Sequence, residues 1–171
     1  MIFAGAELGV LRDVLVIAAT RRAAADLRDT LALRRAVGQI RAHFGPITVL
    51  VNNAANDLRH KWEEVTPEFW DKSIAVNAKH AFFAAQSVLP GMVERGRGHV
   101  INIGSTAGEF PYPGGNAYGA SKAFVRQFSL NLRADLYGTP VRVTDVEPGL
   151  VGGTEFSNIR FKGDDAKAAE I

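Results

Sequence analysis

The sequence predicts an α/β protein with a parallel sheet covered by helices. Four short apolar runs, residues 14–18, 47–51, 100–103 and 141–146, alternate with longer helical patterns. The runs are almost continuously apolar, which is typical of strands buried on both faces. Alternation of such strands with helices indicates a parallel sheet with helices on both faces. In such a sheet, ligands bind at the carboxyl ends of the strands.

Three helical patterns separate the predicted strands. Residues 31–44 are amphipathic, with apolar side chains on one stripe. A second helix is expected to begin at Thr66, because a threonine N-cap followed by Pro67 at the first helical position is a common start signal. It passes Pro90 only with a kink or a break. The third helix covers residues 116–137.

Length and composition favour one packed domain over residues 1–171. Hydrophobic residues make up 47% and charged residues 22%, as in a globular core rather than a disordered chain. The net charge of +2 gives no electrostatic reason to expect nucleic acid or an anionic membrane as a partner. No apolar run reaches the roughly 18 residues that span a bilayer, and residues 1–11 lack the basic start of a signal peptide.

The chain has no cysteine, which excludes disulfides, thiolate metal sites and a cysteine nucleophile, and which fits the cytoplasm. The four histidines show no metal-ligand spacing, so no metal site is predicted and they are interpreted as surface or packing residues: His43, His60, His80 and His99.

Tyr118 and Lys122 are the pair that points to chemistry. They stand four residues apart, about one helical turn, so both side chains share one face of the third helix. A free phenol has a pKa near 10, and an adjacent cation lowers that pKa by favouring the phenolate. Ser105 follows the strand at residues 100–103. The spacing predicts a proton-transfer site.

Polar or turn residues follow three of the predicted strands. Asn52 and Asn53 come after one, Ser105 after the next, and Glu147, Pro148 and Gly149 after the last. Because parallel strands end at one edge, these residues are expected to meet in a cleft. The alternative is that they only end their strands, and the Tyr118–Lys122 pair favours the functional interpretation.

Five elements together resemble the short-chain dehydrogenase/reductase family. They are Asn52-Asn53-Ala54-Ala55, Asn77, Ser105, Tyr118-x-x-x-Lys122 and Pro148-Gly149. The resemblance implies a Rossmann-like doubly wound sheet, an NADP cofactor with NAD as an alternative, a small-molecule substrate and a homo-oligomer. Residues 98–165 resemble more narrowly the NADP-dependent 3-hydroxy acid dehydrogenases that act on serine and allo-threonine. Residues 56–60 resemble sugar-oxidising branches instead, so the substrate stays open.

The resemblance also implies roles for single residues. Tyr118 would be the general acid and base, Lys122 would lower its pKa and bind the nicotinamide ribose, and Ser105 would hold the substrate oxygen. Asn77 would hold a water of a proton relay, or alternatively only bond a neighbouring loop. Further cofactor contacts would come from the ends of two strands: Asn52, Asn53, Ala54, Pro148, Gly149, Val151 and Thr154.

The amino end departs from the family pattern. Gly5 and Gly9 have the spacing of a phosphate-binding glycine turn, but Leu11 stands at the third glycine position. Only two residues separate Leu11 from the strand at 14–18, too few for a helix. That strand is similar to the second strand of NADP-using members, with the third strand as the alternative. As the second strand, it would be followed by Arg21 and Arg22, which would contact the 2′-phosphate, and by Asp26, which would contact the adenine. The alternative is that Arg21 and Arg22 only form the basic start of a helix.

Both ends are therefore expected to be shortened relative to the family. After Pro148-Gly149 only residues 150–171 remain, where the family has a further helix and a last strand. A shortened chain of this kind has three interpretations. It is an NADP-preferring oxidoreductase that interconverts an alcohol and a carbonyl, or it is an inactive remnant of the same fold that binds no cofactor. The third and least favoured interpretation is a self-associating scaffold.

Overall fold

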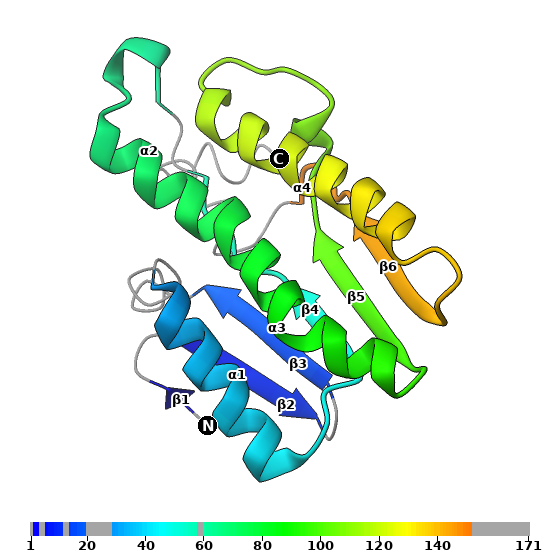
Figure 1. The fold of residues 1–171 in the computed structure, drawn as a ribbon. Helices are drawn as coiled ribbons and strands as arrows, with labels where there is room; N and C mark the ends of the chain where they lie inside the picture. The colour runs from blue at the N-terminus through cyan, green and yellow to red at the C-terminus, as the bar shows by residue number, and fades with distance from the viewer. Residues whose placement is uncertain (1, 4–5, 12–13, 20–28, 58–59, 152–171) are drawn as a thin grey trace.

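The computed structural model describes residues 2–3, 6–11, 14–19, 29–57 and 60–151 of the chain. Its strands form one sheet in sequence order: β1 (Ile2–Phe3), β2 (Ala6–Leu11), β3 (Val14–Ala19), β4 (Val49–Asn52), β5 (Gly98–Ile103) and β6 (Val141–Val146) (Figure 1). The strands from β3 to β6 are parallel, which confirms the predicted α/β class. β1 and β2 add an antiparallel edge that the sequence analysis did not predict.

The register of the parallel strands builds the core row by row. Leu15, Leu50, Val100 and Val143 are paired across β3 to β6, and the first three are fully buried. Two residues further along each strand, the next row runs from Ile17 through Asn52 and Asn102 to Asp145. Because side chains alternate between faces with a period of two, both rows face the same side of the sheet. The second row lies nearer the carboxyl ends of the strands, and its side chains are apolar in β3 but polar in β4, β5 and β6.

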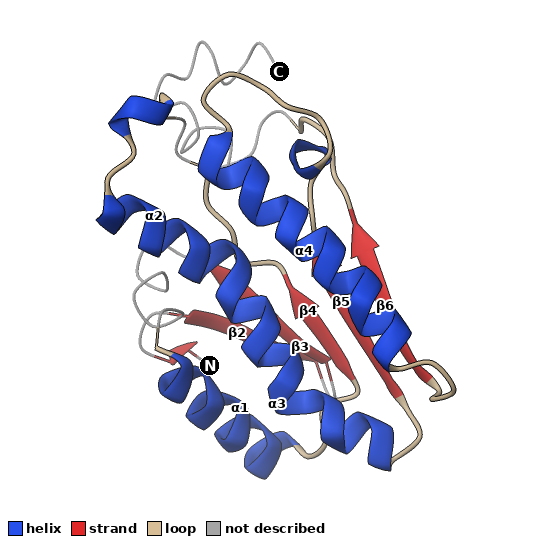
Figure 2. Ribbon diagram, turned by 45° about the horizontal axis from the view of Figure 1, so that its top comes forward, coloured by secondary structure: helices blue, strands red, loops and turns tan. Residues whose placement is uncertain are grey.

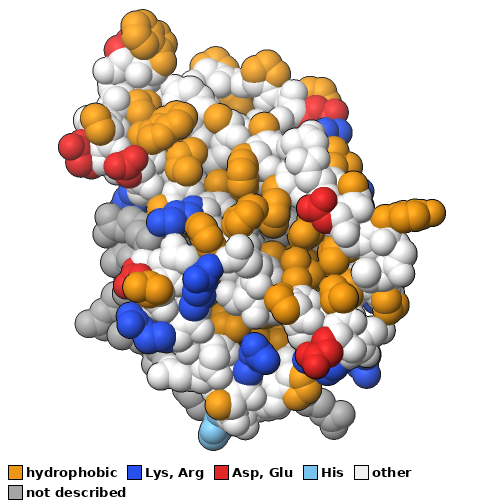
Figure 3. Space-filling view, viewed as in Figure 1, with side chains coloured by type: hydrophobic (Ala, Val, Ile, Leu, Met, Phe, Trp, Pro, Cys, Tyr) orange, Lys and Arg blue, Asp and Glu red, His pale blue; other side chains and the backbone are white. Residues whose placement is uncertain are grey.

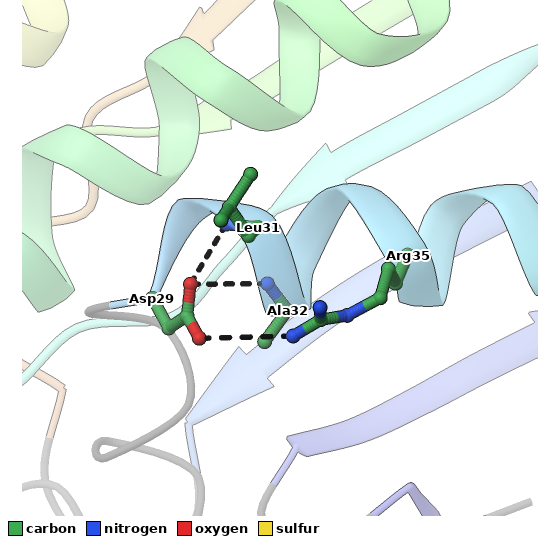
Figure 4. A network of polar contacts seen from close by, with 4 residues as sticks. All are labelled: Asp29, Leu31, Ala32 and Arg35. Carbon is green, nitrogen blue, oxygen red and sulfur yellow. Dashed lines mark hydrogen bonds and ion pairs between the residues drawn. The ribbon is translucent and has the colours of Figure 1, made fainter.

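The first helix, α1 (Thr30–Phe44), has Asp29 as its N-cap residue. The Asp29 carboxylate accepts hydrogen bonds from the backbone N–H groups of Leu31 and Ala32 at 2.8 and 3.1 Å, and it lies 3.9 Å from the Arg35 guanidinium (Figure 4). These contacts satisfy N–H groups that have no partner inside the helix. The two backbone hydrogen bonds also lower the pKa of Asp29.

A long helical run follows β4 and has a change of pitch in its middle. It consists of α2 (Pro67–Ile74), the π-turn η3 (Ala75–Lys79) and α3 (His80–Glu94). It starts as predicted, because Thr66 Oγ1 accepts a hydrogen bond from Phe69 N at 3.2 Å. It also continues through Pro90 to Glu94. The last helix, α4 (Asn116–Asp135), ends two residues before the predicted boundary.

The helices α1, α3 and α4 lie on one face of the sheet (Figures 1 and 2). The strand order explains this placement. Since β3, β4, β5 and β6 follow each other in one direction, successive right-handed crossovers bring every connecting helix to the same side. The expected helical cover is therefore present on one face of the described sheet. On the opposite face, Val16, Val51 and Ile101 are only half-buried.

β3 lies directly beside β4, to which it is parallel. In the doubly wound order 3-2-1-4-5-6, the neighbour of the fourth strand is the first strand, not the second or the third. Both interpretations of residues 14–18 are therefore wrong about its place in the sheet, because β3 occupies the position of a first strand. β2 is antiparallel to it and pairs on its other edge.

Candidate active site

Tyr118 and Lys122 lie on the face of α4 that packs toward the sheet. Their exposed fractions are only 9% and 2%. Lys122 Nζ donates a hydrogen bond to the Ile103 carbonyl oxygen at 2.6 Å and lies 5.7 Å from the centroid of the Tyr118 ring. The two side chains therefore meet at the carboxyl end of β5, the edge at which the sequence placed the cleft.

Burial changes the proton affinity of Lys122. Loss of solvent lowers its pKa to about 8, and the negative charge of Asp145 opposes this effect. His80, on α3, is completely buried, and neither of its ring nitrogens has a hydrogen-bond partner among the described residues. Burial and the charge of Lys122 lower the pKa of His80 to about 4, so His80 is neutral at pH 7.

The loop that carries Ser105 rests directly on α4. Ser105 caps the short helix η4 (Thr106–Gly108), and its Oγ accepts a hydrogen bond from Ala107 N at 3.1 Å. A Cβ at Gly119 would lie 2.9 Å from the Ala107 carbonyl oxygen, and one at Gly108 would lie 2.8 Å from Ala123 N. Two glycines thus allow backbone-to-backbone contact, which brings the Ser105 loop against the turn that carries Tyr118 and Lys122.

This role of Gly108 and Gly119 was not predicted from the sequence. Gly119 lies within a helix, where glycine costs about 1 kcal/mol relative to alanine. That local cost is the signal from which a close approach could have been inferred, because a helical glycine commonly has a packing reason.

Asn77 is buried in the π-turn η3 and binds the loop after β4. Its Oδ1 accepts a hydrogen bond from Asn56 N at 2.8 Å, and its Nδ2 donates one to Asn56 O at 2.9 Å. This is the loop-bonding alternative that the sequence left open. The role of Asn77 in holding a water stays a prediction.

Asn52 belongs to a buried polar network below α4. Its Nδ2 donates to Asn102 Oδ1 at 2.9 Å and to Ala81 O at 3.4 Å. Asn102 Nδ2 donates in turn to Ser129 Oγ at 2.8 Å, and the Ser129 hydroxyl donates to Val125 O. The network joins β4, β5, α3 and α4 below the Tyr118–Lys122 turn. Asn102 was missed, although an asparagine within an apolar strand is itself a signal.

The other residues predicted to contact the cofactor follow β4 and β6 at the same edge of the sheet. Asn53 is exposed, and its backbone N–H donates to Ile17 O at 3.0 Å, whereas Ala54 is buried in the core. Pro148 O accepts a hydrogen bond from Thr106 N at 3.1 Å, which ties the loops after β5 and β6 together. Gly149 has open space around its Cα, and Val151 is 57% exposed.

The predicted glycine turn is not formed at Gly9. This residue lies within β2 and is paired with Val16 of β3 in antiparallel register. Its backbone is therefore part of a strand and not of a turn before a helix. Five further predicted contacts lie outside the described residues: Gly5, Arg21, Arg22, Asp26 and Thr154.

A hollow of about 310 Å³ lies beside α4, but it is not the Tyr118 site. Glu109, Phe110, Pro111 and Tyr112 line it together with Gly119, whereas neither Tyr118 nor Ser105 does. Tyr112 connects this loop to the loop after β4, because its hydroxyl donates to Asp57 Oδ2 at 3.0 Å. The loop at residues 109–112 is therefore joined to the loop after β4.

In the part of the chain that the structure describes, no three His, Asp or Glu side chains are grouped as metal ligands. None of the helices formed by these residues has the length and apolarity required to cross a membrane.

Comparison with known proteins agrees with this arrangement. The family model described as short chain dehydrogenase matches residues 16–164. The NADP-dependent 3-hydroxy acid dehydrogenase YdfG of Salmonella typhi is 58% identical over 149 residues, which are 85% of this chain and 59% of that protein. Sulfoacetaldehyde reductase 2 of Chromohalobacter salexigens is 44% identical over 143 residues, 82% of this chain and 56% of that protein.

Solved structures give the same result. The closed form of a serine dehydrogenase complexed with NADP+ superposes with a TM-score of 0.78 at 57% identity, covering 85% of this chain and 59% of that one. A serine dehydrogenase from Escherichia coli superposes with a TM-score of 0.69 at 54% identity, covering 74% and 59%. The chain thus spans about three fifths of the length of these relatives. It belongs to the short-chain dehydrogenase family.

Proposed function

We propose that the protein is an NADP-dependent oxidoreductase that interconverts an alcohol and a carbonyl on a small polar substrate of the 3-hydroxy acid kind. The observation that carries this proposal is the buried Lys122 ammonium beside the Tyr118 ring at the carboxyl end of β5. The names of the similar dehydrogenases, which state NADP, 3-hydroxy acids and serine, support the cofactor and the substrate class.

The nicotinamide end of NADP fits the residues that are present. The loop after β5 packs on the Tyr118–Lys122 turn and is hydrogen-bonded to the loop after β6, while the loop after β4 is bonded to Asn77 of η3. Gly149 leaves open space at this edge. Lys122 uses one N–H for Ile103 and has two more with which to bind ribose hydroxyls. Arg21 and Arg22 lie outside the described residues, and the proposal keeps them as contacts of the 2′-phosphate only because guanidinium groups suit phosphate.

In carbonyl reduction, Tyr118 gives its hydroxyl proton to the substrate oxygen as that oxygen gains negative charge, and in alcohol oxidation Tyr118 takes the proton back. Lys122 favours the phenolate through its positive charge. Ser105 donates a hydrogen bond to the reacting oxygen and holds it against the Tyr118 hydroxyl. When bound, the nicotinamide supplies or accepts the hydride.

Replacing Tyr118 with Phe tests this function. Loss of the hydroxyl is expected to abolish NADP-dependent oxidation of L-serine, while the far-UV circular dichroism and the melting temperature stay close to wild type. Tyr137→Phe is the matched control, because Tyr137 is 92% exposed. Turnover retained by Tyr118→Phe would reject the assignment.

The alternative is a remnant of the fold that does not hold cofactor. The antiparallel β1–β2 pair favours it, because the described residues before β3 form no helix that could receive a pyrophosphate. Titration with NADPH and NADH, followed by tryptophan fluorescence, separates the two functions. A saturable signal with NADPH supports the dehydrogenase, and no saturable signal at millimolar concentrations supports the remnant.

The same proposal includes a single domain over residues 1–171, a cytoplasmic location and a homo-oligomer, with no nucleic acid or membrane as partner. The absence of cysteine supports the location. Hydrophobic side chains gather on the surface formed by α3 and α4 (Figure 3), where Phe82 and Phe124 are 39% and 44% exposed. Exposed aromatic groups of this kind favour association.

A further inference from the structure

Two opposite charges converge on the end of β5. From α4, Lys122 Nζ donates to the carbonyl oxygen of Ile103 at 2.6 Å. From β6, Asp145 packs against the next residue, since a Cβ at Gly104 would lie only 2.7 Å from Asp145 Oδ1. Because Gly104 has no side chain, the Asp145 carboxylate can occupy this position without a steric clash. The ammonium and the carboxylate contact consecutive residues of one strand end.

The Asp145 carboxylate is buried without a permanent hydrogen-bond donor. Neither of its oxygens has a hydrogen-bond partner of good geometry among the described residues, and the neighbouring Glu147 carboxyl can donate to it only when it is itself protonated. It stands at the end of the polar row, in register with Asn102. A buried carboxylate without donors is costly, unless a nearby cation offsets the lost hydration.

The titratable groups around the two residues come from three places. Asp145 faces Glu147 beyond the end of β6, and Arg133 and Lys122 on α4. Arg133 donates to Val143 O at 3.0 Å, and Glu147 is paired with Arg126 at 3.2 Å. Lys122 faces His80 on α3 as well, and His80 is neutral at pH 7. Among these groups, Asp145 is the anion that acts on Lys122.

We propose that Asp145 is a positioning residue for Lys122: its carboxylate supplies the negative charge that keeps Lys122 an ammonium group in its buried place, and thereby sets the alkaline limit of the reaction. This inference rests on the proposed role of Lys122 in the active site.

The direction of the effect follows from the two titrations. Burial and the proximity of Glu147 raise the pKa of Asp145 to about 6, so its charge is present above that pH. Burial lowers the pKa of Lys122 to about 8, and Asp145 limits that decrease. Removing the charge of Asp145 therefore lowers the pKa of Lys122 further, and the ammonium is lost at a lower pH. The effect is confined to the alkaline side, because Lys122 is protonated at pH 6 with or without Asp145.

The test is Asp145→Asn, which keeps the shape and removes the charge. We expect the alkaline limb of kcat/KM for L-serine oxidation with NADP+ to move down by about one pH unit, which is about tenfold lower kcat/KM at pH 9 and little change at pH 6.5. Asp135→Asn, at an exposed aspartate at the end of α4, the helix that carries Lys122, is the control and leaves the limb in place. An unchanged limb in Asp145→Asn overturns the inference.

A second readout does not need activity. Lysine side chains, reductively methylated with ¹³C, titrate individually in NMR spectra, and the Lys122 signal is identified by its loss in Lys122→Arg. Its midpoint is expected to fall in Asp145→Asn, and an unchanged midpoint contradicts the inference. If the midpoint falls but the wild type oxidises no substrate, the charge coupling stands and the proposed function fails.

Should Asp145→Asn not fold, the reciprocal measurement decides. Charge coupling acts equally on both partners, so Lys122→Met must raise the carboxyl pKa of Asp145 above its wild-type value. The ¹³C chemical shift of the Asp145 carboxyl group reports that pKa. A carboxyl pKa that is unaffected by Lys122→Met would contradict the proposed charge coupling.

Discussion

Gly119 of α4 and Ala107 of η4 touch backbone to backbone: a Cβ at Gly119 would lie 2.9 Å from the Ala107 carbonyl oxygen. Through this contact, the loop that starts at Ser105 lies against the turn that carries Tyr118 and Lys122. The distance between a serine loop and a helix is thus set by a residue that has no functional group.

Gly119→Ala is expected to move η4 away from α4. A methyl group at 2.9 Å from a carbonyl oxygen forces the backbone to shift by a few tenths of an ångström or more. Because displacement of about 1 Å at a reacting group costs about 100-fold in rate, we expect a loss of at least about tenfold in kcat with a small change in melting temperature. Steady-state kinetics of serine oxidation measure it.

Gly38→Ala is the matched control for that substitution. Gly38 is also helical, in α1, but a Cβ there meets no atom within 4 Å. We expect it to stabilise the protein by about 0.5–1 kcal/mol through helix propensity and to leave kcat unchanged. Equal activity in both variants would show that the close approach at Gly119 does not position the site.

Asn77→Ala is expected to destabilise the protein by about 2–4 kcal/mol. The substitution removes both hydrogen bonds to the Asn56 backbone and leaves a buried N–H and C=O without their partner. Urea unfolding measures the loss. Gln127→Ala serves as the control, since the Gln127–Asn131 hydrogen bond is exposed and contributes about 0.5 kcal/mol or less. Similar losses in both variants would contradict a bracing role for Asn77.

His80 is expected to make stability depend on pH in the acidic range. Burial lowers the pKa of His80 from 6.5 to about 4, so below pH 6.5 the unfolded chain binds a proton that the folded chain does not. By linkage, stability falls as the pH decreases from 6.5 to 4, by up to about 3 kcal/mol from this residue.

The raised pKa of Asp145 acts in the opposite direction between pH 6 and 3.8, so the contribution of His80 must be read as a difference. Urea midpoints of the wild type and of His80→Leu are compared at pH 7 and pH 4.5, with the exposed His43→Leu as the control. A pH-independent difference between the wild type and His80→Leu would show that His80 titrates normally in the fold.

Phe124→Glu is expected to dissociate the proposed homo-oligomer. Phe124 stacks on Phe128 with ring centroids 6.0 Å apart, and Phe128 is 5.2 Å from Phe82. The three rings form one aromatic cluster on α3 and α4, in which Phe82 and Phe124 are exposed and Phe128 is half-buried. A buried carboxylate in an interface has no partner there and opposes association. Sedimentation velocity should give the monomer mass for this variant. A larger wild-type species that persists in Phe124→Glu would place the interface elsewhere.

Local sequence pattern was sufficient to predict the four parallel strands, the helices between them and the pairing of Tyr118 with Lys122 on α4. The apolar runs gave the four parallel strands, the Thr66-Pro67 signal gave the start of α2, and the four-residue spacing placed Tyr118 and Lys122 on one helical face. These predictions hold because strand, cap and helix periodicity depend on neighbours within about four residues.

The antiparallel β1–β2 edge was not predictable in the same way. Gly5 and Gly9 have the spacing of a phosphate-binding turn, but Gly9 pairs with Val16 in a hairpin. A short glycine pattern is compatible with both outcomes, and only strand pairing decides between them.

The sequence alone thus determined the α/β class and the placement of Tyr118 and Lys122 on one helical face. The tertiary structure decided that α1, α3 and α4 cover one face of the sheet, that Gly119 permits the approach of the Ser105 loop, and that Asp145 lies near Lys122 at the end of β5. Asp145 and Lys122 are 23 positions apart and belong to different elements. Their coupling depends on sheet register and helix packing, which are fixed by contacts between distant segments and leave no local pattern in the chain.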